Sequence, residues 1–189
     1  MSLKLFRSTG YASILSPGET RVATHPGWLI AAVSAWVGFA CNVALWRALA
    51  AGDSHALMRA VTVGALVAAV CGAVLSVLGW RKTLKPAGTL ILFLMALMAG
   101  SIWAQALPVD ANLLNQDLSS LILPSWASLL QWQLPTLLVG LAVVPTVWMW
   151  QTHVRRLPGP DQLSINMSGV VLAGLVVAGS GFLLFKGLV

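Results

Sequence analysis

The chain has 189 residues, of which 58% are hydrophobic and only 8% are charged. Soluble domains carry about a quarter charged residues, so this composition excludes an ordinary soluble protein and indicates an integral membrane protein. The formal net charge of +6 would also suit a nucleic-acid-binding protein. The basic residues instead form short clusters beside hydrophobic segments, which is the pattern that orients membrane proteins, and we therefore expect no nucleic-acid partner.

Residues 1–27 form an N-terminal arm that contains Lys4, Arg7 and Arg21. Ser16 and Glu19 have the S-x-x-E spacing of a capping box, which favours a short surface helix there. The first apolar run begins late and is about 20 residues long, without a clean cleavage site before a soluble body. We interpret it as a retained membrane span rather than a signal peptide.

The remaining residues, 28–189, are predicted to form an all-α membrane domain. A transmembrane helix needs about 20 predominantly apolar residues. Five segments meet this requirement, at about residues 28–46, 60–80, 87–107, 134–151 and 167–185. Asn42 lies inside the first span, and its amide is expected to face another helix. Pro145 lies inside the fourth span and is expected to kink it.

Small residues in the second and fifth spans are expected to allow close helix contact. They are Gly64, Ala68, Ala69, Gly72 and Ala73 in the second span, and Gly169, Gly174, Gly179 and Gly181 in the fifth. Cys41 and Cys71 belong to no Cys-x-x-Cys motif or Cys/His cluster, so we interpret them as packing residues.

The distribution of Lys and Arg predicts the orientation. With five spans, the N-terminal arm, the 81–85 connection and the 152–166 connection lie on one side of the membrane. They hold eight of the eleven basic residues, namely Lys4, Arg7, Arg21, Arg81, Lys82, Lys85, Arg155 and Arg156. Basic residues accumulate on the cytoplasmic side. The N-terminus is therefore predicted to be cytoplasmic and the C-terminus to lie outside the cytoplasm.

The segment from Leu107 to Trp132, between the third and fourth spans, is too polar to cross a bilayer and contains no Lys or Arg. Its leucines recur at roughly helical spacing, which predicts an amphipathic helix at the membrane surface, on the side away from the cytoplasm. One interpretation is that this helix only closes the fold. The other is that it binds a zwitterionic lipid head group, with carboxylates near the ammonium and amides near the phosphate. The candidate residues are Asp110, Asn115, Gln116, Asp117, Ser119 and Ser120.

The sequence gives little support for metal binding, nucleotide binding, serine-hydrolase catalysis or ion-coupled transport. His25, His55 and His153 lie in three different connections, and the topology separates His55 from the other two. No metal-binding, nucleotide-binding or serine-hydrolase motif is present. Ion-coupled transporters often place ionisable residues in mid-span. Here each charged residue lies at a span end or in a connection, which disfavours a transporter.

Four short motifs carry a family resemblance: NVALWRAL at residues 42–49, GWRKTLKP at 79–86, PVDANLLNQDLSS at 108–120 and VRRLP at 154–158. In this order they resemble the N-terminal membrane domain of the lipid A phosphoethanolamine transferases of the colistin-resistance type. The resemblance implies a bacterial inner-membrane protein whose five helices anchor a periplasmic, zinc-dependent catalytic domain. That domain takes phosphoethanolamine from phosphatidylethanolamine onto a threonine and passes it to lipid A.

The resemblance also implies roles for single residues. An Asn, a Thr and a Glu at four-residue spacing help the family's membrane domain to bind the donor head group. With a one-residue gap, Asn115 and Ser119 take the Asn and Thr places. Without the gap, Gln116 and Ser120 take them. The Glu place falls on Leu123 or Pro124, so this chain departs from the family there, and Asp117 is a candidate substitute.

The sequence ends at Val189, where the family continues into its catalytic domain. The threonine nucleophile and the zinc ligands are expected beyond that point, so we assign no catalytic residue, metal ligand or cofactor to this chain. The expected partners are membrane lipids and a C-terminal periplasmic domain or partner protein. The alternative function is a stand-alone inner-membrane scaffold or accessory subunit, and a small transporter is a third possibility.

Overall fold

The computed structural model describes residues 24–80, 82–104, 132–154 and 159–186. These residues fold into helices, as the sequence predicts. The helices and the two π-helical segments, η1 and η3, are α3 (Pro26–Ala35), η1 (Trp36–Ala40), α4 (Val43–Ala51), α5 (Ser54–Val77), α6 (Leu84–Ala104), α9 (Gln133–Leu138), η3 (Val139–Val143), α10 (Val144–Gln151) and α11 (Gly159–Phe185).

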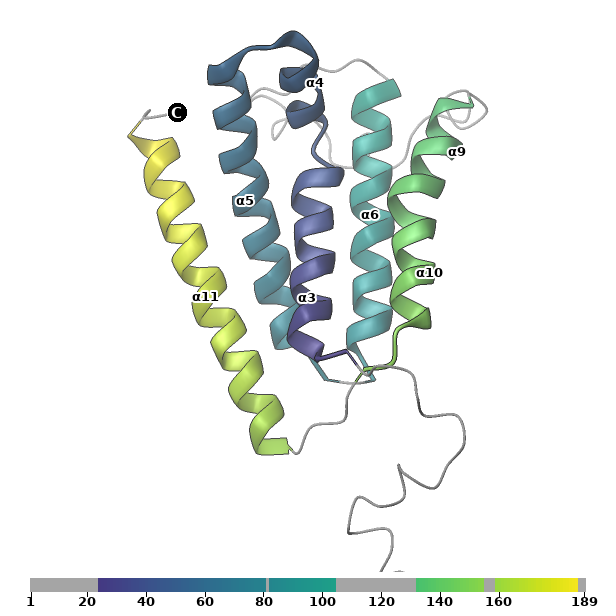
Figure 1. The fold of residues 1–189 in the computed structure, drawn as a ribbon, viewed down its shortest axis with the longest axis vertical. Coiled ribbons are helices and arrows are strands. Elements are labelled where there is room, and N and C mark those ends of the chain that lie inside the picture. Colours follow the sequence, from purple (N-terminus) through teal and green to yellow (C-terminus); the bar gives the residue numbers. More distant parts are fainter. Residues whose placement is uncertain (1–23, 81, 105–131, 155–158, 187–189) are drawn as a thin grey trace, which may run out of the picture.

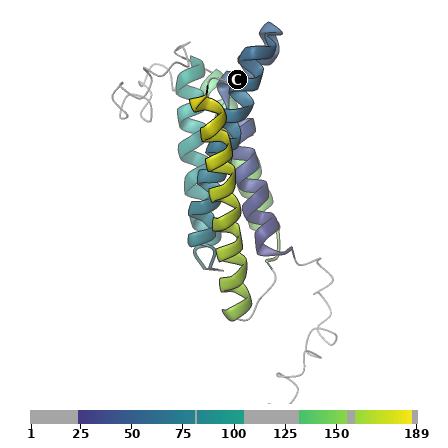
Figure 2. The same ribbon diagram turned by 90° about the vertical axis from the view of Figure 1, so that its left-hand side faces the viewer.

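The helices stand roughly parallel in one bundle, with α11 at one edge and α9 and α10 at the other (Figure 1). α5 packs against α3, α4 and α11, while α6 packs against α9, η3 and α10. Seen edge-on, the helices overlap in a narrow band (Figure 2). We call the end where α3, α6 and α11 begin the lower end, and the end where α5 and α9 begin the upper end, as drawn in Figure 1.

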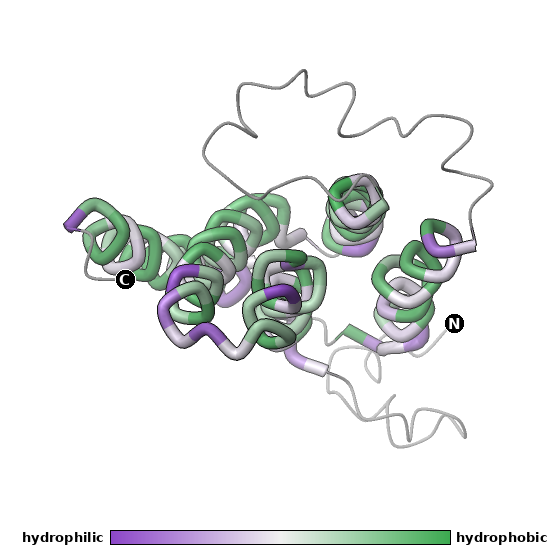
Figure 3. Tube along the Cα trace, turned by 90° about the horizontal axis from the view of Figure 1, so that it is seen from above, coloured by the Kyte–Doolittle hydropathy of each residue, from purple (hydrophilic) through white to green (hydrophobic). Residues whose placement is uncertain are grey.

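Four helical stretches are long and apolar enough to cross a membrane: Ser54–Val77, Leu84–Ala104, Gln133–Gln151 and Gly159–Phe185. Pro26–Ala40 and Val43–Ala51 pass the same test as a bent pair. Apolar residues predominate along the helices (Figure 3), and many large apolar side chains are exposed on the outside of the bundle. Exposed tryptophans lie near both ends, Trp28 and Trp80 at the lower end and Trp46 and Trp132 at the upper. Tryptophans at both ends are typical of membrane–water interfaces, so the fold is that of a multi-pass membrane protein.

The first predicted span is not one continuous helix. The sequence predicts a single helix over residues 28–46, whereas the structure breaks it at Cys41 and Asn42 and bends it by 52°. Asn42 is the N-cap of α4, with extended backbone angles (φ −84°, ψ 95°). Its Oδ1 accepts a hydrogen bond from the Leu45 amide at 3.2 Å. Asparagine side chains compete in this way with the backbone hydrogen bonds of a helix. The prediction of one continuous helix did not take this competition into account.

The prediction that Asn42 finds a partner on another helix is confirmed. Its Nδ2 donates to the Ala60 carbonyl in α5 at 2.8 Å. One side chain therefore begins α4 and also ties the broken helix to its neighbour.

Helix caps explain why α5 begins at Ser54 rather than near residue 60. Gly52 ends α4 with φ 70°, a left-handed conformation that glycine adopts without steric cost. The Asp53 carboxylate then accepts hydrogen bonds from the amides of His55 at 2.9 Å and Ala56 at 3.3 Å. α11 also begins earlier than predicted, at Gly159 rather than near residue 167. Both helices are thus longer than hydrophobicity alone indicates.

The kink at Pro145 stays a prediction, but the structure shows how the helix accommodates this proline. The helix passes through the π-helical segment η3, and Pro145 stands in the first turn of α10. Proline has no amide hydrogen, so it cannot donate to the carbonyl four residues earlier, which belongs to Leu141. The indole Nε1 of Trp36 donates to that carbonyl at 3.0 Å. A neighbouring helix thus supplies the donor that Pro145 lacks.

A close helix crossing joins η1 to α5 through glycine. A Cβ atom on Gly38 would lie 2.4 Å from the Gly64 carbonyl oxygen, and a Cβ on Gly64 would lie 2.6 Å from that of Gly38. Gly64 therefore packs as predicted, and so does Gly169, which meets Ser76. The prediction of close packing is wrong for Gly174, Gly179 and Gly181. Apart from nearby parts of their own helix, no heavy atom of a described residue lies within 4 Å of a Cβ built on any of them.

We expect Gly64→Ala to lower the stability of the folded protein, because the added methyl overlaps the Gly38 backbone. Overpacking of this kind costs about 1–3 kcal/mol. Gly174→Ala is the matched control, since it also lies mid-helix and its Cβ meets open space. Thermal unfolding in detergent should show a lower midpoint for Gly64→Ala alone. Equal midpoints would contradict the close crossing.

Candidate functional site

The predicted binding residues Asp110, Asn115, Gln116, Asp117, Ser119 and Ser120 all lie outside the described residues, as does the predicted amphipathic helix. Their assignment stays a prediction. The structure does describe the helices on either side of this segment. α6 ends at Ala104 and α9 begins at Gln133, and both ends lie at the upper end of the bundle (Figure 1).

A cavity of about 410 Å³ opens between α4, α6, α9 and η3, near the ends of α6 and α9. We call it the upper cavity. Its wall is almost entirely apolar, and it is lined by Ala40, Cys41, Val43, Trp46, Ala99, Trp103, Leu137 and Leu141. Its volume lies within the roughly 300–1,000 Å³ of ordinary ligand pockets. This cavity can therefore hold an apolar group such as part of a lipid chain.

The break in the first span shapes the upper cavity. The bend at Asn42 carries Trp46 into the cavity wall, and its indole Nε1 donates back across the break to the Ala40 carbonyl at 2.9 Å. Arg47 donates from Nη2 to the Ile102 carbonyl near the end of α6 at 3.2 Å. A cation is favourable at the C-terminus of a helix, where carbonyl groups point outward. The Arg47 hydrogen bond therefore ties α4 to the upper end of α6.

At the lower end, a basic residue from the GWRKTLKP motif fastens two helices together. Lys85 donates from Nζ to the carbonyls of Trp150 at 3.1 Å and Thr152 at 2.9 Å, and its Nζ lies 5.7 Å from the centroid of the Trp150 ring. The Trp150 indole in turn donates to the Thr89 hydroxyl at 3.0 Å. The sequence indicates Lys85 only as a topology signal, because Trp150 is 65 residues away.

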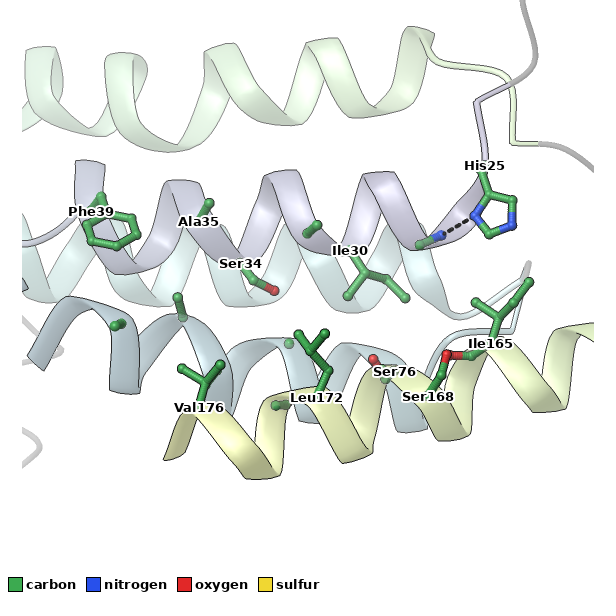
Figure 4. Close-up of a pocket in the computed structure, with 18 residues that line it drawn as sticks. His25, Ile30, Ser34, Ala35, Phe39, Ser76, Ile165, Ser168, Leu172 and Val176 are labelled. Atoms are coloured by element: carbon green, nitrogen blue, oxygen red, sulfur yellow. Dashed lines mark hydrogen bonds between the residues drawn. The ribbon is translucent and has the colours of Figure 1, made fainter. Parts of the chain in front are cut away.

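A second hollow lies at the lower end, where α3 and α11 pack on the same side of α5 (Figure 4). It has a volume of about 530 Å³, and we call it the lower groove. Small residues of α5 form its floor, among them Ala65, Ala69 and Gly72. No feature of the sequence singles out this groove, because its three walls come from residues far apart in the chain.

The described histidines and acidic residues do not gather into a metal site. Within the described ranges, no group of three or more His, Cys, Asp or Glu side chains could hold a metal ion. His25 stands at the lower end, where its Nδ1 accepts a hydrogen bond from the Gly27 amide at 3.2 Å. His55 stands in the first turn of α5 at the upper end.

Fold and surface thus define an α-helical, multi-pass membrane protein in which the upper cavity and the lower groove lie toward opposite ends of the bundle. Comparison with protein-family models, with curated proteins and with solved structures found no match. A more particular assignment therefore rests on the short motifs in the sequence and on the two cavities.

The Trp36–Leu141 hydrogen bond yields a test by double mutation. Trp36→Phe leaves the Leu141 carbonyl, at the outer surface of the bundle, without its donor. A backbone carbonyl that lacks a hydrogen bond is unfavourable in apolar surroundings, where no water replaces the donor. Pro145→Ala restores an amide hydrogen four residues after Leu141. We therefore expect Trp36→Phe to destabilise the protein less in a Pro145→Ala background than in the wild type.

Unfolding midpoints of the four proteins in this cycle measure that coupling. Strictly additive effects of the two substitutions would show that Pro145 and Trp36 do not act on the same carbonyl.

Proposed function

We propose that this chain is the membrane domain of a phosphoethanolamine transferase that modifies lipid A. In this function it anchors a zinc-dependent catalytic domain in the bacterial inner membrane and presents the donor lipid, phosphatidylethanolamine, to that domain. The order of four motifs along the chain supports the family. The position of the upper cavity supports the role in lipid presentation, and this position is the observation on which the proposal depends.

The upper cavity stands between the two helix ends that residues 105–131 join. Trp103 lines the cavity one residue before α6 ends, and Leu137 lines it within the first turns of α9. A lipid with one acyl chain in this cavity has its head group at the level of the connecting segment. Asp110 and Asp117 then supply carboxylates for the ammonium group, and Asn115 and Ser119 supply donors for the phosphate.

In the proposed orientation the lower end is cytoplasmic and the upper end is periplasmic, with the bent pair counted as the first of five spans. The basic residues Lys82 and Lys85 then stand on the cytoplasmic side, as membrane proteins generally place them. α11 ends at the periplasmic surface, so a catalytic domain that follows this helix is on the same side as the head group.

A second candidate function is that of a membrane scaffold or accessory subunit, and α11 supplies the observation in its favour. This helix packs mainly on α5 and exposes large apolar residues along the rest of its length, including Leu172, Leu175 and Phe185. Glycines that meet no neighbour lie on the same helix. A partner helix would find close approach there, as small residues allow in membranes.

The donor site predicts a selective lipid preference. The purified chain should retain phosphatidylethanolamine over phosphatidylglycerol in native mass spectrometry, because only the former carries the ammonium group. Asn115→Ala and Ser119→Ala should weaken this retention more than Asn112→Ala, by roughly threefold to tenfold for one lost hydrogen bond. Leu137→Trp, which fills the upper cavity, should also weaken it, whereas Val139→Trp on the exposed surface should not.

Equal retention of both lipids by all of these proteins would leave residues 107–132 as a connection that only closes the fold. The scaffold function would then be favoured.

A further inference from the structure

The core of the bundle is smaller near the break in the first span than toward the lower end. Among the described residues, eight buried side chains form one cluster, most of them near the lower ends of α3, α5, α6 and α10. At the break, Cys41, Val43 and Ala99 form a second cluster of three. Regions with few buried apolar contacts open and move at a lower free energy than a large core. The upper half is therefore the part of the bundle in which a helix can most easily change its position.

Cys41 and Val43 stand between two cavities. Both residues line the upper cavity, and both also line a further cavity of about 120 Å³. We call this further space the inner cavity, because its remaining walls come from α5, through Val63 and Val67, and from α6, through Met95. Protein interiors contain few voids larger than a water molecule. A wall with such a void on each side has little packing to hold it in one position.

The helix that carries this wall, α4, lies between two joints. Before it, the π-helical segment η1 and the extended backbone of Asn42 interrupt the α-helical pattern. After it, Gly52 has φ 70°, and apart from its chain neighbours no heavy atom of a described residue lies within 4 Å of a Cβ built there. Irregular segments of this kind are the usual places at which helices bend. The nine residues of α4 can therefore turn as one piece between these joints.

Side chains rather than a continuous helix hold α4 in its present position. The Trp46 indole donates to the Ala40 carbonyl at 2.9 Å, and Arg47 donates to the Ile102 carbonyl at 3.2 Å. The first backbone hydrogen bond of α4, from the Trp46 amide to the Asn42 carbonyl, is long at 3.4 Å. The side-chain hydrogen bond of Asn42 to α5 lies at the joint itself, so it can persist while α4 turns.

A turn of α4 toward the inner cavity transfers volume from one cavity to the other. Cys41 and Val43 then move toward Val63, Val67 and Met95, and the upper cavity widens by the same displacement. These side chains leave one apolar environment for another, so the movement requires little desolvation of polar groups. Met95 has an unbranched, flexible side chain that adapts to a change in the shape of its surroundings.

We propose that α4 is a movable wall of the upper cavity, which turns about Asn42 and widens this cavity for the acyl chain of a lipid from the surrounding bilayer. Trp46 and Trp103 line the cavity and are also exposed on the outside of the bundle, where lipid chains lie. The movement itself does not depend on the transferase function. That its occupant is an acyl chain rests on the proposed role of the upper cavity in lipid presentation.

The test places fluorotryptophan at Trp46, in the wall itself, and records fluorine NMR spectra of the 189-residue chain in bilayer nanodiscs. Two positions of α4 should give the wild type two resonances, or one line broadened by exchange. Ala44→Leu should fill the inner cavity, stop the movement and leave one sharp resonance. Ala50→Leu is the matched control, since Ala50 is exposed on the same helix, and it should keep the wild-type spectrum.

Ala44 also separates movement of the helix from movement of the ring. It lines the inner cavity but not the upper cavity, so a flip of the Trp46 ring alone should not respond to Ala44→Leu. Arg47→Leu tests the opposite direction. It removes the hydrogen bond to Ile102 and should raise the ratio of the second position to the first by roughly threefold to tenfold, as expected for one lost hydrogen bond.

The occupant is tested by comparing nanodiscs of phosphatidylethanolamine with straight chains and with methyl-branched chains. The wider chains should raise the share of the second position, because they need the wider cavity. One sharp resonance from the wild type, or an Ala44→Leu spectrum that keeps the wild-type lines, would overturn the movable wall. Equal shares in the two lipids would overturn the acyl chain as its occupant. Loss of the head-group preference in native mass spectrometry would overturn the proposed function without changing these spectra.

Discussion

The Asn42 side chain holds together the part of the structure on which the rest depends. Its carbonyl oxygen caps α4, and its amide group donates to the Ala60 carbonyl of α5. That second bond anchors the break in the first span on α5. The 52° bend lies at this residue, and the bend places Trp46 in the wall of the upper cavity. Asn42, a polar residue within an apolar span, therefore has a structural role.

The same physical constraint explains the other unusual contacts of the bundle. A hydrocarbon environment offers no water to backbone groups, so each carbonyl that a helix leaves unbonded needs a donor from the protein. Trp36 supplies it for Leu141, Trp46 for Ala40 and Lys85 for the carbonyls at the end of α10. These tryptophans and this lysine are therefore hydrogen-bond donors within the fold. Their roles as apolar or topology-determining residues do not reveal this.

The upper cavity and the lower groove differ in polarity and in position along the bundle. The upper cavity is apolar throughout and lies beside helix ends that a polar segment joins. The lower groove carries its own polar groups and ends near the middle of the bundle. The two hollows therefore lie toward opposite ends of the bundle and differ in the polarity of their walls.

The sequence by itself determined the class of protein, because long apolar stretches without charge can only be satisfied as helices in a bilayer. It also determined that Asn42 needs a partner and that Gly64 marks a close contact, since both follow from the chemistry of one residue. The polar head-group residues Asn115 and Ser119 still rest on the sequence alone. The tertiary structure decided where the first span breaks, how Pro145 is accommodated and what Lys85 binds. It alone revealed the lower groove, because the groove depends on which helices lie side by side, and hydrophobic patterns along one chain do not specify that order.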